Sequence, residues 1–137
     1  MKLFEPIKIG NVELKNRVIM APMENGMAAV GTGEVTDRII AFFEERAQHN
    51  IAMIMPGSIG VSPEGRGLPT QLSLFDEKQV AGHKRLVDAI HSKGSLVAAQ
   101  LYHAGRQASE AITGLDPLAP SAIPCGILQN HPKRNYS

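Results

Sequence analysis

The chain has 137 residues, 43% of them hydrophobic and 20% charged, which is typical of a globular protein of one domain. The net charge is +1, and the scattered Lys and Arg residues argue against a nucleic-acid or a membrane partner. A single cysteine, Cys125, excludes an internal disulfide, and no signal-peptide pattern or bilayer-spanning apolar run is present. We therefore expect a cytoplasmic protein that binds small molecules.

The amino-terminal residues predict a hairpin and then a different kind of strand. Alternating apolar and polar residues at 7–9 and 12–14 flank a Gly-Asn turn dipeptide, which is typical of a β-hairpin. Residues 17–23 are almost continuously apolar after the first position, and Pro22 ends this strand because proline cannot donate to a sheet ladder. Residues 24–33, rich in Gly and small side chains, are predicted to form a loop.

A helix is predicted next, and a buried strand follows it. Thr36 is a suitable N-cap for a helix from Asp37 to about His49, and Asn50 can adopt the left-handed conformation that ends it. Residues 51–55 form a short apolar run, which indicates a buried strand. The helix has one apolar stripe: Ile39, Ile40, Phe43 and Ala47.

The second helix has clear signals at both ends. Residues 56–69 have the Gly and Pro content of an irregular loop. Asp76 is the expected N-cap, Gln79 occupies the capping-box position, and Gly94 is the expected stop. The buried face of this helix is expected to contain four residues: Val80, Leu86, Val87 and Ile90.

An apolar run from Ser95 to Leu101 predicts a third buried strand, which ends in polar residues up to Arg106. The order strand, helix, strand, helix, strand predicts consecutive parallel βα units, and therefore an α/β fold. Residues 107–137 are rich in proline and lack periodicity. We interpret them as a long excursion or a frayed end of the same domain.

The carboxyl ends of the three predicted parallel strands should share one rim, where such folds bind ligands. Gly57 allows a flat ligand to approach the backbone, and the amide of Gln100 offers a donor and an acceptor. Without a glycine-rich phosphate loop or a rim lysine, this set suits an aromatic heterocycle with an imide-like edge better than a phosphate. The first strand contributes an apolar surface with free carbonyls: Ala21, Pro22 and Met23, followed by Glu24.

Each rim residue also has a structural interpretation. A Gln at the end of a strand is more often a satisfied structural amide than a ligand contact, and Gly57 is compatible with a tight turn. Arg106 has three candidate ion-pair partners at the rim: Glu24, Glu64 and Glu110.

Other polar residues give no sign of chemistry. His83 and His91 lie on the second predicted helix and are expected to be solvated. Ser58 and Ser62 lack the elbow motif of a nucleophile, and no His, Cys, Asp or Glu group has metal-ligand spacing. We therefore assign no catalytic residue and no metal site.

Several separated motifs, in the correct order, resemble the amino-terminal third of the Old Yellow Enzyme family. The most similar branch is that of bacterial NADH:flavin oxidoreductases and 2,4-dienoyl-CoA reductases. The resemblance extends from Met1 to Pro124. The motifs are Leu-Phe-Glu-Pro at 3–6, Leu-Lys-Asn-Arg at 14–17, Met-Ala-Pro-Met at 20–23, Pro-Glu-Gly-Arg at 63–66 and Gln-Leu-Tyr-His-Ala-Gly-Arg at 100–106.

This resemblance implies a TIM barrel that holds FMN at its rim and reduces activated alkenes with NADH or NADPH. It also implies that the Gln100 amide bonds the pyrimidine edge of the flavin and that Gly57 lies close to the ring. Glu24 stands where relatives commonly carry Thr or Cys near flavin O4. The backbone expected to meet the flavin is that of Ala21, Pro22 and Met23.

A complete barrel needs about 250 residues and eight strands, whereas this sequence predicts three strands of that kind. The resemblance implies that residues 1–137 are the amino-terminal part of a longer ene-reductase, and that the isolated chain is inactive. An iron-sulphur cluster would belong only to a longer parent. The alternative is a stand-alone α/β module without catalysis that completes another chain. Open sheet edges predict a homo-oligomer, or association with the remaining part of the barrel.

Overall fold

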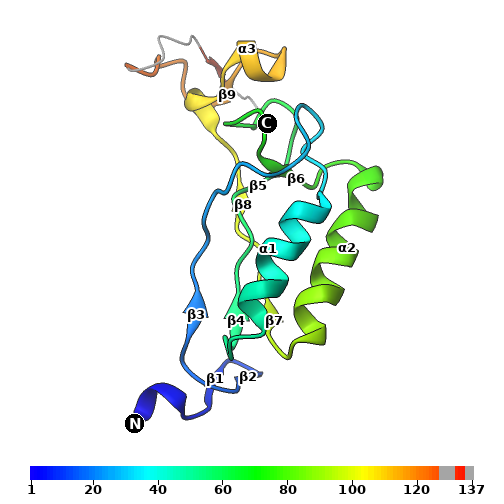
Figure 1. Cartoon of the computed structure of the whole chain (residues 1–137). Helices are drawn as coiled ribbons and strands as arrows, with labels where there is room; N and C mark the ends of the chain where they lie inside the picture. Colours follow the sequence, from blue (N-terminus) through cyan, green and yellow to red (C-terminus); the bar gives the residue numbers. More distant parts are fainter. Residues whose placement is uncertain (127–131, 135–137) are drawn as a thin grey trace.

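The structure is a computed structural model that describes residues 1–126 and 132–134 (Figure 1). The chain begins with a 3-10 turn, η1 (Lys2–Phe4), and an antiparallel hairpin of β1 (Ile7–Ile9) and β2 (Val12–Leu14). Gly10 has a φ of +58°, which the tight turn between the strands requires. The predicted hairpin is confirmed.

Three short parallel strands form what we call the body sheet. They are β3 (Ile19–Met20), β4 (Met53–Ile54) and β7 (Leu96–Val97), in the order β3-β4-β7. Each lies inside one of the three predicted apolar runs, and neighbouring strands are parallel. The prediction of consecutive parallel βα units is therefore confirmed.

A second parallel sheet, which we call the rim sheet, lies beyond the body sheet (Figure 1). It consists of β5 (Ile59–Gly60), β6 (Leu72–Ser73) and β8 (Leu101–Tyr102), with β5 in the centre. The expectation of an irregular loop over residues 56–69 is therefore wrong for β5. The N–H of Ile59 donates to the carbonyl of Gln100 (2.9 Å), so the second strand resumes beside the third. Local Gly and Pro content does not reveal such long-range pairing.

Helix α1 (Asp37–Ala47) begins and ends as the sequence predicts, within two residues at its carboxyl end. The hydroxyl of Thr36 accepts a hydrogen bond from the N–H of Ile39 (3.3 Å), which confirms the cap. Asn50 has a φ of 59°, so the chain leaves the helix through a left-handed residue.

Helix α2 (Glu77–Ser92) has the predicted capping box. The side-chain oxygen of Gln79 accepts from the N–H of Asp76 (3.1 Å), and the Asp76 carboxylate accepts from backbone N–H groups of the first turn. Gly94 follows with a φ of +74°. Val80 is 48% exposed, so its predicted burial is wrong. Arg85 of α2 pairs with Asp37 at the start of α1, and Val80 therefore lies beyond the level at which α1 begins.

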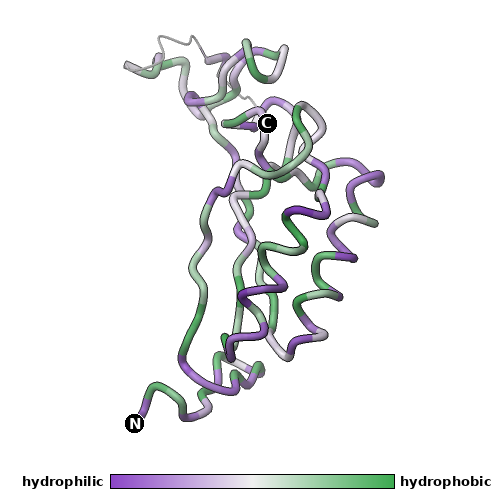
Figure 2. Tube along the Cα trace, in the orientation of Figure 1, coloured by the Kyte–Doolittle hydropathy of each residue, from purple (hydrophilic) through white to green (hydrophobic). Residues whose placement is uncertain are grey.

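The core lies between the body sheet and the two helices, which pack against each other on the same side of that sheet (Figure 1). Figure 2 shows that the helices alternate between hydrophilic and hydrophobic residues, as expected for elements that bury one face. The buried core residues are Ala28, Ile39, Phe43, Ala47, Ile54, Ile59, Leu72, Leu86 and Ile90.

The segment predicted as an excursion or frayed end, residues 107–137, contains regular structure in its described part. After η2 (Gly105–Gln107), it contains α3 (Glu110–Thr113) and the parallel pair β9 (Leu118–Ala119) and β10 (Lys133–Arg134). The remainder of this prediction, at 127–131 and 135–137, lies outside the described residues. Within the described chain, no helix has the length and apolar character needed to cross a bilayer.

Candidate functional site

Two neighbouring strands break at the same level, between the body sheet and the rim sheet. The break between β4 and β5 contains Gly57, whose peptide bond to Ser58 is cis, and the break between β7 and β8 contains Gln100. The N–H of Gln100 donates to the carbonyl of Pro56 (3.2 Å), and the carbonyl of Gln100 accepts from the N–H of Ile59 (2.9 Å). The backbone of Gln100 therefore holds the two breaks together.

Gly57 is buried against Gln100 and leaves no room for a side chain. A Cβ added at position 57 would lie 2.7 Å from Cβ and 3.2 Å from Oε1 of Gln100. The φ of Gly57 lies outside the left-handed region, so space rather than a tight turn requires glycine here. Gly57 and Gln100, predicted to share a rim, are thus in direct contact.

The side-chain amide of Gln100 is available to a ligand. The residue is exposed, and within residues 1–126 and 132–134 its amide forms no hydrogen bond. Only the backbone of Gln100 has a structural role in the described residues. The side-chain amide is therefore not the satisfied structural amide of the alternative interpretation.

The first strand ends at the same level as the other two. The N–H of Met55 donates to the carbonyl of Met20 (3.1 Å), directly before Ala21. Ala21 and Met23 are exposed and Pro22 is half-buried, so this segment presents backbone and apolar surface beside the two breaks.

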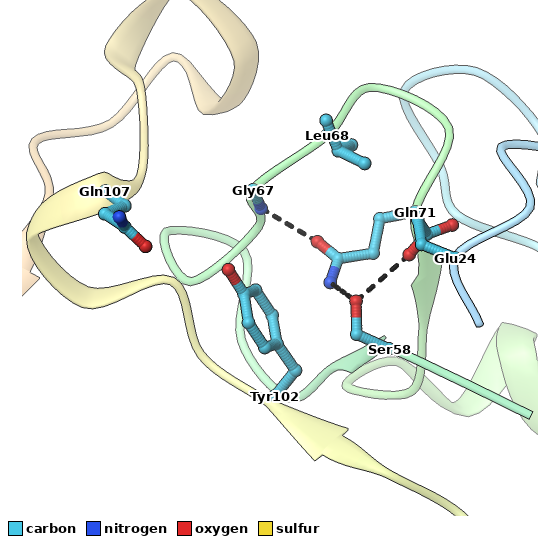
Figure 3. A pocket seen from close by; sticks show the side chains of 7 residues that line it. All are labelled: Glu24, Ser58, Gly67, Leu68, Gln71, Tyr102 and Gln107. Atoms are coloured by element: carbon cyan, nitrogen blue, oxygen red, sulfur yellow. Dashed lines mark hydrogen bonds between the residues drawn. The ribbon is translucent and has the colours of Figure 1, made fainter. Parts of the chain in front are cut away.

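Glu24 accepts hydrogen bonds at both carboxylate oxygens, and Figure 3 shows the one from Ser58. The Ser58 hydroxyl donates to Oε2 (3.0 Å), and the N–H of Gly26 donates to Oε1 (3.2 Å). The amide of Gln71 donates to Ser58 Oγ (2.6 Å), while its oxygen accepts from the N–H of Gly67 (2.8 Å). In this series of hydrogen bonds every donor points toward the Glu24 carboxylate. The series therefore fixes the position of the negative charge.

This hydrogen-bonded chain forms one wall of a pocket of about 390 Å³. No sequence signal indicates Gln71, which is 1% exposed and lies just outside the segment predicted to be a loop. The hydrogen bond from Ser58 to Glu24 was not predicted, because the two residues are 34 positions apart in the sequence. The pocket is lined by Glu24, Ser58, Gly67, Leu68, Gln71, Tyr102 and Gln107 (Figure 3).

Arg66 joins the two loops that surround the pocket. It is 5% exposed, and its guanidinium donates to the carbonyl of Gly31 and to that of Pro69 (2.8 Å). Burial lowers the pKa of Arg66 below its ordinary value. The side chain therefore holds the loop after β3 against the loop between β5 and β6.

Within the described residues, Arg106 forms no ion pair with its three candidate partners, Glu24, Glu64 and Glu110. Arg106 is exposed, and Glu24 is occupied by Ser58 and Gly26. Glu64 instead faces the imidazole of His103, with Oε1 3.7 Å from Nε2. The pKa of Glu64 is lowered, chiefly by a backbone hydrogen bond at Glu64 itself and further by His103.

His103 is oriented by the backbone. Its Nδ1 accepts from the N–H of Gly105 (2.9 Å), and a Cβ at Gly65 would lie 2.5 Å from its ring. The ring is therefore packed closely against the loop that carries Glu64.

The expectation that both helix histidines are solvated is wrong for His83, although His91 is exposed. His83 is half-buried, and its Nε2 donates to the carbonyl of Ser73 (3.0 Å) because this face of α2 lies against β6. Burial lowers the pKa of His83. In the described residues, no three His, Cys, Asp or Glu side chains are grouped as metal ligands.

Parallel βα units with a site at their carboxyl ends define the class: this is an arc of a (β/α) barrel. The family model of the NADH:flavin oxidoreductase / NADH oxidase family matches residues 2–134, and the chain belongs to this family. It is 38% identical over 133 residues to NADH oxidase of Thermoanaerobacter brockii. It is also 40% identical over 131 residues to a metal reductase of Desulforamulus reducens. These alignments cover 96% and 95% of this chain but 20% and 19% of the relatives, so the chain spans about a fifth of their length.

Solved structures agree on the fold. A 2-naphthoyl-CoA reductase superposes with a TM-score of 0.90 at 28% identity, covering 99% of this chain and 22% of that one. The Old Yellow Enzyme homologue of Zymomonas mobilis gives a TM-score of 0.83 at 33% identity, covering 90% and 34%. The predicted partial TIM barrel of the Old Yellow Enzyme type is thus confirmed, as an open arc with parallel sheets.

Proposed function

We propose that this chain is the FMN-binding amino-terminal part of a flavin oxidoreductase that reduces activated C=C bonds with NADH or NADPH. The observation that carries the proposal is the contact of Gly57 with Gln100, which leaves a free amide beside a surface without a side chain. The names of relatives support the chemistry, since they include morphinone reductase, also solved with tetrahydroNAD, and 2-naphthoyl-CoA reductase.

The rim residues fit a flavin in shape and in chemistry. The ring would lie against Gly57, and the Gln100 amide would pair with the pyrimidine edge, which carries both donors and acceptors. The backbone from Ala21 to Met23 would meet the same ring from the first strand. When bound, FMN supplies the hydride chemistry that none of these side chains provides.

Glu24 fits this arrangement because its carboxylate is held by the protein. A carboxylate aimed at the ring would disfavour an anionic reduced flavin. Both oxygens are instead bonded, one to Ser58 and one to the N–H of Gly26. We assign Glu24 to the edge of the flavin site, together with the other rim residues.

The test is FMN binding by a Gln100→Leu variant of the full-length protein. Loss of the amide leaves the polar edge of the flavin unpaired, at a cost of about 1–3 kcal/mol, which is a rise of roughly 5- to 150-fold in Kd. Titration of the apoprotein with FMN, followed by quenching of flavin fluorescence, measures this change. An unchanged Kd would count against the assignment.

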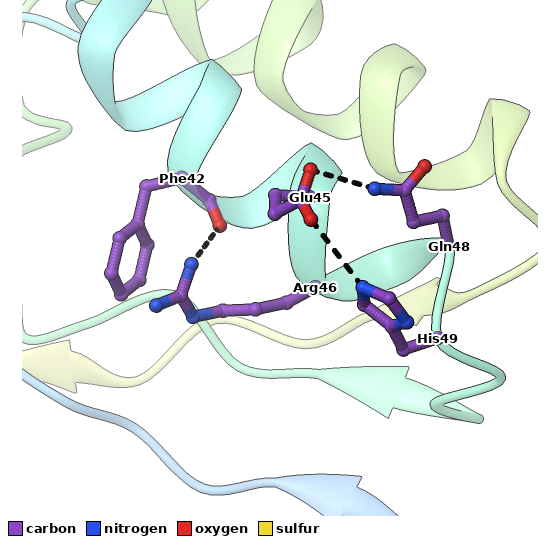
Figure 4. Close-up of polar contacts among 5 residues, drawn as sticks. All are labelled: Phe42, Glu45, Arg46, Gln48 and His49. Carbon is purple, nitrogen blue, oxygen red and sulfur yellow. Dashed lines mark hydrogen bonds and ion pairs between the residues drawn. The ribbon is translucent and has the colours of Figure 1, made fainter.

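Gln48→Leu is the matched control for that experiment. Gln48 lies after the end of α1, where its amide donates to Glu45 Oε2 (2.7 Å), among surface contacts that include His49 and Arg46 (Figure 4). This substitution removes an exposed amide away from the rim. It should leave the Kd for FMN unchanged.

We also propose that residues 1–137 alone do not complete turnover. The described strands form one arc, and hydride transfer needs the alkene within about 3–3.5 Å of the donor atom, held from both sides of the ring. Exposed apolar residues such as Leu101 (66%) and Met23 (59%) should drive self-association, or docking of the remaining barrel. To check this, loss of a conjugated enone is followed under anaerobic conditions with excess FMN and NADH. The mass of the protein in solution is measured on the same sample. Turnover by a monomer would contradict it.

A further inference from the structure

Gln71 is a buried residue whose amide bonds two walls of the pocket of about 390 Å³. It is 1% exposed, its side-chain oxygen accepts from the N–H of Gly67 (2.8 Å), and its side-chain nitrogen donates to Ser58 Oγ (2.6 Å). A backbone N–H can only donate, so the bond from Gly67 identifies the oxygen end of the amide. The amide nitrogen must therefore face Ser58 (Figure 3).

The Ser58 hydroxyl passes this direction on to Glu24. A hydroxyl has one proton to donate, and the Gln71 amide already occupies one of the lone pairs of its oxygen. A carboxylate can only accept, so the Ser58 proton points to Glu24 Oε2 (3.0 Å). Each bond in the series thus has a defined donor, beginning from the N–H of Gly67.

This series of hydrogen bonds connects two parts of the surface proposed to meet the flavin. Ser58 directly follows Gly57 in the break between β4 and β5, and Glu24 directly follows Met23 after the first strand. The backbone of Gln100 holds the same break to the third strand. The position of Gly57 is therefore fixed from the first strand as well as from the third, and the Gln71 amide sets the direction of the first of these links.

We propose that Gln71 is a positioning residue of the flavin site, which acts through Ser58 by directing the hydroxyl proton to Glu24. The inference rests on the proposed function and adds to that site a residue that acts through another side chain. The role of Gln71 depends on which end of its amide donates, and not on its volume. A side chain of the same shape that accepts where Gln71 donates should therefore disturb FMN binding.

Gln71→Glu makes this exchange, because an ionised carboxyl group has the shape of the amide and only accepts. The ionised group would take the Ser58 proton for itself, and Glu24 would lose that donor. The protonated group keeps one O–H donor and can replace the amide. Burial and the neighbouring Glu24 carboxylate raise the pKa of the introduced group above about 4.3, the ordinary value for Glu. The effect should therefore appear at high pH and disappear at low pH.

Fluorescence titration of the full-length apoproteins with FMN gives the ratio of the Kd of Gln71→Glu to that of the wild type. This ratio should be at least about fivefold near pH 8 and fall below about twofold near pH 5. A ratio that does not fall as the pH is lowered overturns the inference. The other charged and titratable groups around this segment are the same in both proteins, so their own titration cancels in the ratio: Glu24, Glu64, Arg66, His83, Tyr102 and His103.

Gln48→Glu is the matched control. It makes the same exchange at an exposed amide that donates to a carboxylate, Glu45 Oε2 (2.7 Å), away from the rim. Its Kd ratio to the wild type should stay near one at both pH values. A rise near pH 8 equal to that of Gln71→Glu would show a general effect of added charge and overturn the inference.

Circular dichroism of the same samples shows whether Gln71→Glu is folded. If it is not, Ser58→Ala replaces it, because this change removes the hydroxyl through which Gln71 acts. Its Kd for FMN should rise at least about threefold, and an unchanged Kd overturns the inference. Ser92→Ala, which removes a hydroxyl bonded to the carbonyl of Ala89 (2.7 Å) at the end of α2, should leave the Kd unchanged.

The wild-type titration separates this inference from the proposed function. A wild-type protein that does not bind FMN contradicts the proposed function, and this inference with it. A wild-type protein that binds FMN, with a Kd ratio for Gln71→Glu that is independent of pH, contradicts only the role of Gln71.

Discussion

The body sheet and the rim sheet are both three-stranded and parallel, but they are held by different forces. Around the body sheet the fully buried side chains are mainly apolar, such as Phe43, Ile54 and Ile90. Around the rim sheet several buried residues are polar or charged: Arg66, Gln71, Ser73 and Gln79. Apolar packing tolerates exchange of similar volumes, whereas hydrogen bonds fix directions. The rim geometry is thus specified by polar groups.

The loop after β3 illustrates this difference. The amide of Gln79 donates to the carbonyl of Thr32 (2.8 Å), and the N–H of Ser73 donates to that of Gly33 (3.0 Å). Arg66 adds its bond to Gly31. The loop that carries Glu24 is therefore held from α2, from β6 and from the loop before β6, although few of its side chains enter the core.

The largest effect is expected in the body. Phe43→Ala removes a ring that is 1% exposed in the core, and should lower the free energy of unfolding by about 3–5 kcal/mol through lost burial and a cavity. Phe4→Ala, at a ring that is 59% exposed, should change it by less than about 0.5 kcal/mol. Urea denaturation of the full-length variants measures both. Similar values for the two would show that the body is not held by apolar packing.

At the boundary between the sheets, Gly57→Ala should act on both stability and ligand binding. The new Cβ would lie 2.7 Å from Cβ of Gln100, so the two breaks must move apart, at about 1–3 kcal/mol. FMN content of the purified protein should fall as well. Gly126→Ala, where no atom of the described residues lies within 4 Å of the added Cβ, should preserve both. A Gly57→Ala protein that retains its full FMN content would show that Gly57 does not belong to the flavin site.

In the rim, His103 should support the loop rather than transfer protons. His103→Ala removes the acceptor for the N–H of Gly105, at about 1 kcal/mol, and should lower the melting temperature or flavin content before the intrinsic rate. His103→Asn, which keeps an acceptor, should restore part of the loss. Normal flavin and melting temperature with turnover reduced by several orders of magnitude would make His103 catalytic.

The smallest effect is a pH dependence at the contact of α2 with β6. Because burial lowers the pKa of His83, the unfolded chain binds more protons than the folded one at pH values below about 6.5. The contribution of His83 to the free energy of unfolding is therefore complete above that pH. It is lost as the pH falls toward the pKa of His83 in the folded protein. His83→Gln should flatten the profile of unfolding free energy against pH, and His91→Gln should not. Parallel profiles for wild type and His83→Gln would contradict the prediction.

The sequence alone determined those features whose signals are local. The hairpin followed from a turn dipeptide between alternating residues, and both helix starts followed from caps at Thr36 and Asp76, which bond within three residues. The separated motifs also indicated the family. The order of parallel βα units, which brings strand ends together, indicated that Gly57 and Gln100 share one rim.

Only the tertiary structure decided the features that depend on partners distant in the chain. Glu24 meets Ser58 across 34 positions, and Gln71 enters that chain of bonds from a segment without periodicity. The exposure of Val80 and the burial of His83 depend on where α1 begins and on where β6 lies against α2. A hydrogen bond between residues far apart leaves no repeat or spacing in the sequence, so the polar rim becomes visible only after the apolar body has set the strands side by side.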